Sequence, residues 1–213
     1  MIIGLPIGMV NSNSYLIFDE STTADGAVID PGGEIQPLLD QITLNRVTLH
    51  YLLNTHGHFD HAAANAQLKT LYPIRLGLHP ADGMLLATGG GGALFGIPPI
   101  ASPDPDLELN DGLILEIGQL HLQVYHTPGH TPGSVCIYCP EERALFTGDT
   151  LFAGSVGRTD LPGGNARQLT TSLLRLLTFP PETRILPGHG PESTLADERR
   201  LNPWLRRLAN QYR

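Results

Sequence analysis

The stretch LLNTHGHFDH, residues 52–61, places three histidines and an aspartate within six positions directly after an apolar run. Side chains repeat every 2 residues on a strand and every 3.6 on a helix, so these four cannot share one face of either. A sharp loop at the end of a strand would turn them inward together. The Ala-rich segment 60–73 that follows is typical of a helix that starts beside the loop and ends at Pro73.

Three later loops have the same character, because each follows an apolar strand-like run and offers a side chain that binds metals. HTPGH contributes His130, FTGDT contributes Asp149 and PGHG contributes His189. Imidazole and carboxylate suit zinc, iron or manganese, and two ions with a shared water need about this many ligands. The four loops together predict a metal centre.

A single histidine at a strand end is more often a hydrogen-bonded loop residue than a ligand. We interpret the remaining histidines in that way: His50, His79, His121 and His126.

Strand signals and helix signals succeed one another along the whole chain. Strands are predicted in the segments 14–20, 26–33, 47–56, 74–80, 113–130, 134–140, 143–152 and 183–190. Helices are predicted over 34–42, 60–73, 166–177 and, interrupted at Pro203, over 196–213. The Gly- and Pro-rich segment 88–106 is typical of a mobile loop rather than a domain linker. This order favours an α/β fold with helices packed outside sheets, in one domain spanning residues 1–213.

Composition excludes several classes of protein. Hydrophobic residues make up 41% of the 213 residues, and no run approaches the roughly 20 apolar residues of a membrane helix. The N-terminal stretch has no basic region, so it does not resemble a signal peptide, and we expect a cytoplasmic protein with no membrane partner. The net charge of −8, with no basic cluster before the C-terminal tail, disfavours a nucleic-acid partner.

The two cysteines, Cys136 and Cys139, form a CxxC pair inside an alternating apolar run. No second CxxC exists to complete a zinc site. We interpret them as two small apolar residues of a strand.

HxHxDH followed by His130, Asp149 and His189 in that order resembles the metallo-β-lactamase superfamily. The resemblance covers nearly the whole chain, through NSYLI, AVIDPGG, THGHFDH, HTPGHTPGSV, GDTLF, GSVGRTDLPGG, LPGHGP and NPW. Within the superfamily these stretches are most similar to the glyoxalase II group, the hydroxyacylglutathione hydrolases, in their short bacterial form. The family implies an αββα sandwich with the active site along one edge of two sheets.

The resemblance also implies a ligand set with no substitution. His56, His58 and His130 would hold one metal, Asp60, His61 and His189 the other, and Asp149 would bridge both. The two ions would be zinc, with iron or manganese as alternatives. A cysteine often stands at the position of Asp149 in true metallo-β-lactamases, and a glutamate replaces His58 in the flavodiiron variant, so both activities are disfavoured.

Full-length glyoxalase II enzymes carry a C-terminal helical domain that grips glutathione. This chain continues only 24 residues past His189, so the resemblance implies a form without that domain. We expect the loop 88–106 to replace part of the lost wall.

The implied reaction is hydrolysis of S-D-lactoylglutathione to D-lactate and glutathione by a hydroxide bound to two metals. Asp60 and Asp149 would accept hydrogen bonds from that hydroxide and aim it. A thiolate leaves without an acid, because thiol pKa values lie near 8.5. The enzyme would thus be a thioester hydrolase that acts on a small glutathione-derived molecule, as a monomer or small homo-oligomer.

Three alternatives remain open. A persulfide dioxygenase of the same fold would use one iron held by His56, His130 and Asp149, although its usual GRTDFQ stretch reads GRTDLPGG here. A lactonase or another ester hydrolase would use the same two-metal site. A metal-binding scaffold without catalysis would be expected to have a broken ligand set, and this set is intact.

Arg158 in GSVGRTDLPGG follows the Asp149 strand closely enough to reach the mouth of the site. It would either clamp a substrate carboxylate or form a salt bridge with Asp160, and the sequence does not separate these roles. Three aromatic residues are candidates for the pocket lining, although we favour core packing for each: Tyr15, Tyr125 and Phe152.

Overall fold

Each half of the chain builds one six-stranded sheet in the computed structural model, which describes residues 1–21 and 24–211. The first sheet has its strands in chain order: β1 (Ile2–Ile7), β2 (Ser12–Phe18), β3 (Asp25–Ile29), β4 (Thr48–Leu53), β5 (Arg75–Leu78) and β6 (Leu107–Glu108). The pairs β1–β2 and β2–β3 are antiparallel, and the three pairs from β3 to β6 are parallel. The predicted helices and loops that follow β3, β4 and β5 provide the crossovers that parallel pairs need.

The second sheet has the order β14-β13-β10-β9-β8-β7. Its strands are β7 (Ile114–Ile117), β8 (Leu120–His126), β9 (Val135–Cys139), β10 (Ala144–Gly148), β13 (Arg184–Pro187) and β14 (Ser193–Thr194). A short hairpin, β11 (Leu151–Phe152) and β12 (Ser155–Val156), follows β10. Because β9 is antiparallel to both β8 and β10, and β13 is parallel to β10, the strands β8, β10 and β13 all end at one edge of the sheet.

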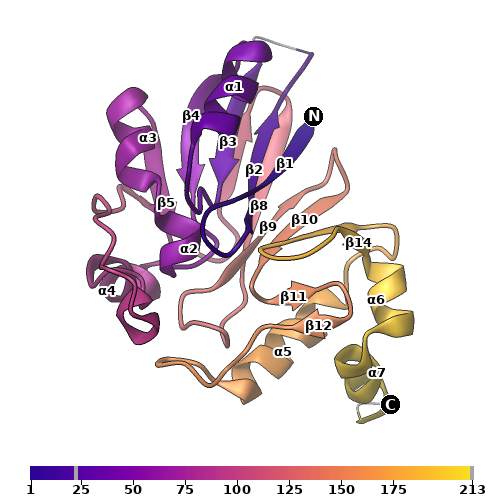
Figure 1. Ribbon diagram of the computed structural model, residues 1–213. Helices are drawn as coiled ribbons and strands as arrows, with labels where there is room; N and C mark the ends of the chain where they lie inside the picture. Colours follow the sequence, from indigo (N-terminus) through magenta and orange to yellow (C-terminus); the bar gives the residue numbers. More distant parts are fainter. Residues whose placement is uncertain (22–23, 212–213) are drawn as a thin grey trace.

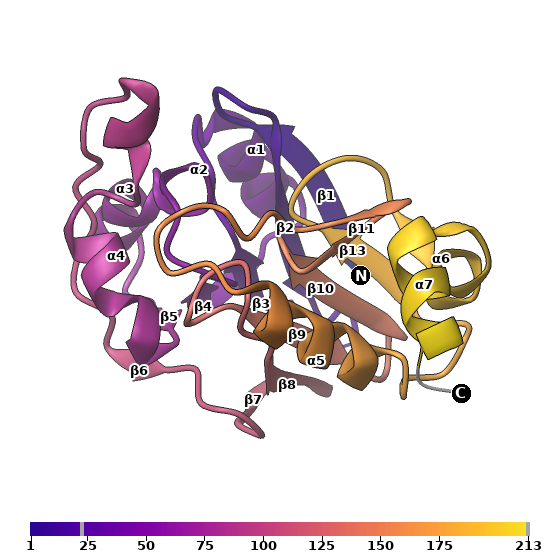
Figure 2. The same cartoon turned by 90° about the horizontal axis from the view of Figure 1, so that it is seen from below.

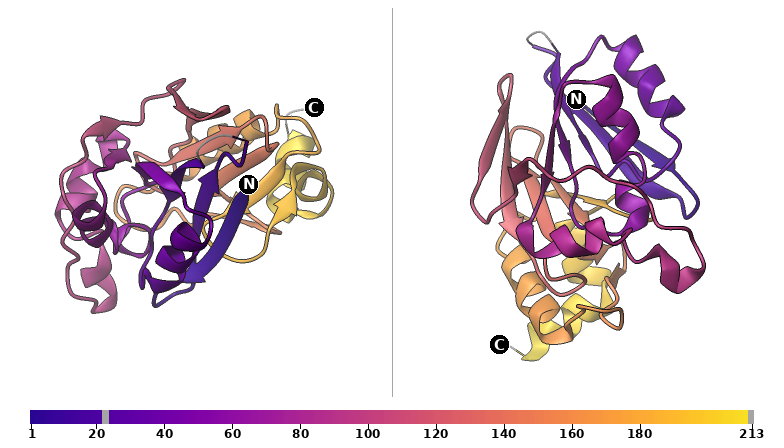
Figure 3. Two further views of the ribbon diagram at one scale, coloured as in Figure 1. Left: turned by 90° about the horizontal axis from the view of Figure 1, so that it is seen from above. Right: turned by 90° about the vertical axis from the view of Figure 1, so that its left-hand side faces the viewer.

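Helices cover the outer face of each sheet (Figure 1). The helices α1 (Gln36–Leu44), α2 (Phe59–Ala62) and α3 (Asn65–Leu71) belong to the first sheet, and α5 (Ala166–Leu176), α6 (Leu195–Leu201) and α7 (Pro203–Gln211) to the second. The helices η1 (Pro80–Asp82), α4 (Gly83–Ala87) and η2 (Gly92–Phe95) lie between β5 and β6. Figures 2 and 3 show the two helical layers on opposite sides of the paired sheets. The predicted αββα sandwich is confirmed.

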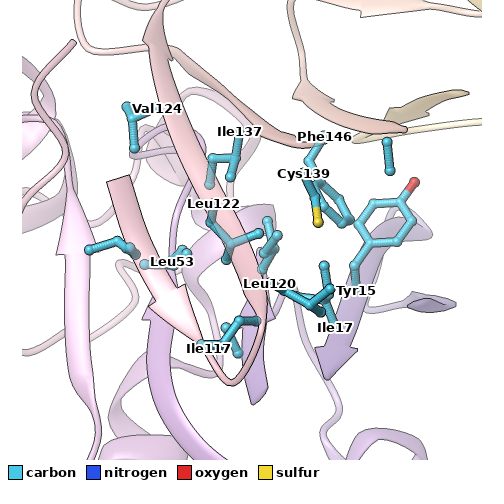
Figure 4. Packing of buried hydrophobic residues seen from close by; sticks show 14 of the residues in the cluster. Tyr15, Ile17, Leu53, Ile117, Leu120, Leu122, Val124, Ile137, Cys139 and Phe146 are labelled. Atoms are coloured by element: carbon cyan, nitrogen blue, oxygen red, sulfur yellow. The ribbon is translucent and has the colours of Figure 1, made fainter. Parts of the chain in front are cut away.

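The main core lies between the two sheets, where the inward-facing side chains of both meet (Figure 4). On β8, Leu122 and Val124 are fully buried while His121 faces outward, as expected when alternate residues face opposite sides. Tyr15 from the first sheet meets Phe146 from the second edge to face, with ring centroids 5.2 Å apart. Aromatic contacts of this kind stabilise beyond the area they bury, by about 0.5–1.5 kcal/mol.

Two outer cores attach the helices to the sheets. Leu38 and Ile42 of α1 and Leu68 of α3 pack on the first sheet. On the second sheet, α5 buries Leu169, Leu173 and Leu176, which recur at the helical period. Asn165 starts α5 by accepting hydrogen bonds from the N–H groups of Arg167 and Gln168.

Several local predictions need correction or addition. The segment 60–73 forms two short helices rather than one, because the N–H of Ala64 donates to the carbonyl of Pro31, 3.0 Å away, instead of to a helical partner. The strand β1 was not predicted, since its glycine and proline mask the pattern. The tail is helical with the predicted break next to Pro203, although residues 212–213 lie outside the described residues. Cys136 and Cys139 are buried and unbridged in β9, as expected.

The segment 88–106 is a loop between two parts of the same sheet, as predicted, and it contains η2. Across the described residues, every helix is too short or too polar to cross a bilayer.

Candidate metal centre

The seven predicted ligands all follow the ends of strands that open onto one edge of the sandwich. The loop after β4 carries His56 and His58, and the helix α2 that follows it carries Asp60 and His61. The loops after β8, β10 and β13 carry His130, Asp149 and His189. Both sheets therefore contribute to one cluster.

The ligand atoms form overlapping groups in which all atoms lie within 4.8 Å of one another. The groups are His56–His58–His130, Asp60–His61–His189 and His56–His61–Asp149. The first two correspond to the two implied metal sites. Asp149 lies between them, with Oδ2 at 3.5 Å from Nε2 of His130 and Oδ1 at 3.4 Å from Nε2 of His61. This position suits a carboxylate that touches two ions.

Hydrogen bonds fix which nitrogen faces the cluster in three of the imidazoles. Asp30 can only accept, so Nδ1 of His61 donates to its Oδ2 at 3.1 Å, leaving Nε2 to face the centre. Thr55 donates its hydroxyl proton to the same carboxylate at 2.6 Å and therefore accepts from Nδ1 of His56 at 3.1 Å. The carbonyl of Arg158 accepts from Nδ1 of His130 at 2.8 Å. Partners of this kind orient metal-binding histidines in proteins generally.

Three buried polar atoms at the centre of the cluster have no hydrogen-bond partner among the described residues: Nε2 of His56, Nε2 of His61 and Oδ1 of Asp149. Burying such atoms without a partner costs about 1–3 kcal/mol each. Nδ1 of His58 and Nε2 of His130 face each other at 3.0 Å. Two nitrogens bound tetrahedrally to one zinc would lie about 3.3 Å apart, given Zn–N bonds of roughly 2.0–2.1 Å. The donor set thus fits bound metal.

Two histidines of the first triplet, His56 and His58, are held in the neutral form. Burial lowers the pKa of His56 well below its usual value, and the nearby histidines lower it further. Burial, together with the neighbouring His130, lowers the pKa of His58 to about 4. Metal binding requires neutral imidazoles, and these two are neutral at pH 7.

In the second triplet the pKa values are shifted towards the charged forms of the side chains. Burial opposes a charge on His61, but the carboxylates of Asp149 and Asp30 raise its pKa well above the usual value. Burial likewise opposes a charge on His189, and its contact with Asp60, 3.1 Å away, raises the pKa. Burial opposes a charge on Asp60, but His189 and His61 together outweigh it and lower the pKa of Asp60. Binding of an ion at this triplet would compete with protonation of His61 and His189.

Asp82 is a fully buried carboxylate that links the two loops of the first triplet. Its Oδ2 accepts from the N–H of Gly57 at 2.9 Å and from the hydroxyl of Thr131 at 2.7 Å, and its Oδ1 accepts from the N–H of Gly133 at 2.6 Å. Gly57 lies between His56 and His58, while Thr131 follows His130. Asp82 thereby holds both loops in one arrangement.

Sequence reasoning did not assign a role to Asp30 or Asp82. Asp30 stands in the motif AVIDPGG, and its left-handed backbone (φ 50°) is a conformation that aspartate adopts more readily than most residues. That motif was a usable signal. Asp82, in HPADG, offers no signal in the sequence, because its partners are 25 to 51 residues away.

Gly188 is required beside the cluster. A Cβ at this position would lie 2.4 Å from Oδ1 of Asp149 and 2.6 Å from Cε1 of His61. Any side chain would therefore displace two ligands.

A cavity of about 560 Å³ opens next to the cluster and is lined by five of the ligands. These are His58, Asp60, His130, Asp149 and His189. A volume of this size is within the range of small-molecule sites.

Arg158 also lines the cavity, but its guanidinium is paired with Asp160 through two hydrogen bonds of 2.7 Å. Both side chains are exposed, so the pair contributes little to stability. Of the three aromatic candidates, Tyr15 lies in the core and donates to the carbonyl of Pro187, and Tyr125 packs on Phe179. Phe152 lies beside His189, with ring centroids 6.2 Å apart.

The other histidines have partners away from the cluster. His50 contacts Asp25 at 2.6 Å and His121 contacts Glu141 at 2.7 Å. His79 and His126 stack on each other with ring centroids 4.0 Å apart.

The comparisons with known proteins agree with this geometry. The family model described as "Metallo-beta-lactamase superfamily" matches residues 7–189, from the first strand to the last ligand. The chain belongs to the metallo-beta-lactamase superfamily. Among curated superfamily members, hydroxyacylglutathione hydrolase GloC of Haemophilus influenzae is 38% identical over 205 residues, which cover 94% of this chain and 96% of that one.

Two solved structures of the superfamily show the same fold over almost the full length. The crystal structure of BLEG-1 B3 metallo-beta-lactamase is 35% identical with a TM-score of 0.90, covering 96% of this chain and 99% of that chain. The crystal structure of TTHA1623 in a di-iron-bound form is 40% identical with a TM-score of 0.85, covering 95% of this chain and 100% of that chain. The superfamily contains metallo-hydrolases, and its chemistry requires divalent metal of the kind this cluster fits.

Proposed function

We propose that this protein is a thioester hydrolase that cleaves S-D-lactoylglutathione, or a closely related glutathione thioester, to the free acid and thiol. The observation that carries the proposal is the convergence of seven ligand-type side chains, with three unpartnered buried atoms, beside an open cavity. The similarity to a relative named hydroxyacylglutathione hydrolase supports the choice of substrate.

The residues of the centre have separate roles in this reaction. Two divalent ions held by the two triplets and Asp149 would lower the pKa of a shared water towards about 7 and polarise the substrate carbonyl. Asp60 and Asp149 accept hydrogen bonds from the attacking water and aim it at the carbonyl carbon. Ser12 fixes Asp60 for this task by donating to its Oδ2 at 3.1 Å. The thiolate leaves without a proton, because thiol pKa values lie near 8.5.

We propose zinc as the metal, with iron as the second candidate, since a similar structure is described in a di-iron form. Elemental analysis of protein purified without added metal distinguishes them. The proposed compartment is the cytoplasm and the proposed partner is the small-molecule thioester.

Arg158 is proposed to bind a carboxylate of the substrate, sharing or exchanging its pairing with Asp160. Arg158→Lys keeps the charge and loses the planar fork, so kcat/KM should fall by about tenfold on carboxylate-bearing thioesters. Metal content should not change. An equal loss on neutral thioesters would assign Arg158 a structural role.

The test of the function follows thioester loss and free thiol release by metal-loaded protein, with Asp149→Ala as the inactive control. Oxygen uptake with glutathione persulfide and iron is measured in parallel, because His56, His130 and Asp149 could hold a single iron. A chromogenic cephalosporin is included because BLEG-1 is described as a metallo-beta-lactamase. Oxygen uptake or lactam cleavage in the absence of thioester cleavage would overturn the proposal.

A further inference from the structure

One side of the cavity is formed by apolar side chains rather than by polar groups. Phe59 comes from α2, Leu85 from α4, and Leu94, Phe95 and Ile97 from η2 and the residues after it. We call these five residues the apolar wall. The wall continues directly from His58, so a molecule whose carbonyl lies at the metal centre reaches it.

The apolar wall presents large hydrophobic side chains to solvent. Leu94 is 60% exposed and Phe95 is 53% exposed. The rings of Phe59 and Phe95 are 6.4 Å apart. An exposed apolar surface that lines a concave site, beside convergent polar groups, is typical of a binding site for an apolar ligand.

The backbone holds the apolar wall against the metal centre. The N–H of Gly90 donates to the carbonyl of Leu85 at 2.9 Å, and the N–H of Phe59 donates to the carbonyl of Gly90 at 3.0 Å. Gly90 has φ 67°, and a Cβ there would lie 2.4 Å from the nitrogen of Phe59, so only glycine allows this approach. The wall is therefore preformed next to His58.

The lack of charged side chains on the apolar wall indicates which half of a thioester would bind there. Outside the metal ligands, the charged side chain among the described residues lining the cavity is Arg158, which comes from the loop after β12. The soluble thiols that carry acyl groups in cells bear carboxylates or phosphates, which an uncharged wall does not bind. The acyl half is the part of the substrate without such groups.

Building on the thioester hydrolysis proposed above, which covers D-lactoyl and related glutathione thioesters, we propose that the apolar wall is an acyl pocket that raises activity on apolar acyl groups larger than lactoyl. Each methylene of the acyl chain that lies on the wall leaves water, which stabilises the complex by transfer from water to an apolar surface. A lactoyl group, with one methyl and one hydroxyl, would leave most of the wall uncovered.

The test measures kcat/KM for acetyl, butyryl, hexanoyl and D-lactoyl thioesters of one thiol, glutathione, with metal-loaded protein. We expect kcat/KM to rise about threefold for each added methylene from acetyl to hexanoyl. In the double variant Leu94→Ser/Phe95→Ser the ratio of kcat/KM for hexanoyl to kcat/KM for acetyl should fall to less than half of the wild-type ratio. The largest loss of kcat/KM is expected on the hexanoyl substrate. The matched control is Leu44→Ser, an exposed leucine on α1 that is 74% exposed and should keep the wild-type rise.

A binding measurement separates failure of the acyl pocket from failure of the hydrolase function. It uses carba analogues of the same compounds, in which a methylene replaces the sulfur and prevents cleavage. Tighter binding of the hexanoyl than of the acetyl analogue, lost in the double variant, supports the acyl pocket even if no thioester is cleaved. Thioester cleavage with equal kcat/KM across the series, or with D-lactoyl preferred over hexanoyl, overturns the acyl pocket and leaves the hydrolase function intact.

Discussion

At the scale of single residues, Asp149 and His189 differ in how many of the two ligand triplets they contact. Asp149 lies within 3.5 Å of ligand atoms from both triplets, whereas His189 belongs to one. Asp149→Ala should therefore reduce metal content from about two ions per chain to below one, and His189→Ala should leave about one. Elemental analysis after dialysis measures both, with His121→Ala as a surface control. Two ions retained by Asp149→Ala would show that the residue does not bridge.

Replacement of the buried carboxylate of Asp82 should affect both stability and metal affinity. All three groups that point at it are donors, from Gly57, Thr131 and Gly133. Asp82→Asn has the same shape but turns an N–H₂ towards at least one of these donors, so we expect unfolding free energy to drop by about 1–3 kcal/mol. Metal affinity should fall by about 10–100-fold, as for other residues that orient ligands.

Urea unfolding and metal titration measure the two effects of Asp82→Asn. Asp40→Asn, on the exposed face of α1, is the control. Wild-type metal affinity in a destabilised Asp82→Asn protein would limit its role to folding.

The contrast between the ligands and their supports shows what the sequence can reveal at this scale. The HxHxDH motif could be recognised in the sequence because its four ligands lie close together along the chain, so their spacing alone forms the pattern. Asp82 contacts the same segments, but its partners are 25 and 51 positions away in the sequence, and only the fold brings them together. Pairing of Arg158 with Asp160 was one of two predicted roles, and it is the contact that the structure contains.

At the scale of elements, the stacked rings of His79 and His126 join the end of β5 to the end of β8, and so one sheet to the other. Burial lowers the pKa of His79, and the neighbouring His126 lowers it further, against the opposing charges of Asp82, Glu108 and Asp111. A histidine with a lowered folded-state pKa takes up its proton more readily when unfolded. Its contribution to stability is therefore full above the unfolded pKa of about 6.5 and declines as the pH falls below it.

We expect metal-free protein to lose more stability between pH 7.5 and pH 5.5 with His79 present than in His79→Gln. Urea unfolding at both pH values isolates the residue, because the remaining histidines are common to both proteins. His50→Gln, a surface histidine paired with Asp25, is the matched control. If wild type and His79→Gln lose the same free energy of unfolding between the two pH values, the stacked pair does not contribute to the pH dependence of stability.

Helices and strands whose apolar residues recur with a clear period were predicted well. Those that depend on contacts with distant segments of the chain were not. The period of residues 166–177 gave α5 within one residue at its end, because its apolar face alone decides it. The break between α2 and α3 depends on a hydrogen bond from Ala64 to Pro31, in a different segment, which no local pattern contains. The strand β1 depends on pairing with β2 rather than on its own sequence.

At the scale of the whole molecule, the candidate metal ligands come from both halves of the chain. Four ligands come from the loop after β4 and the helix α2, and three come from the loops of the second sheet. Metal binding should therefore stabilise the folded protein by about 4 kcal/mol when free metal exceeds the dissociation constant 1,000-fold. For a chain of this length the midpoint of thermal unfolding should rise by roughly 10 °C.

Thermal unfolding with and without a chelator measures this difference. The triple-ligand change His56→Ala/His61→Ala/Asp149→Ala should remove the response to the chelator. A midpoint that does not depend on metal in the wild-type protein would show that the centre does not hold the halves together.

The division of the chain into one continuous sheet per half also makes the protein suitable for fragment complementation. A cut in the turn between β6 and β7 leaves each fragment with one complete six-stranded sheet, and separates the ligands four to three. The fragments would meet through the apolar faces between the sheets, and each bound ion would tether one fragment to the other. Fused to the halves of a reporter, such a pair would turn the concentration of available metal into a signal of reassembly.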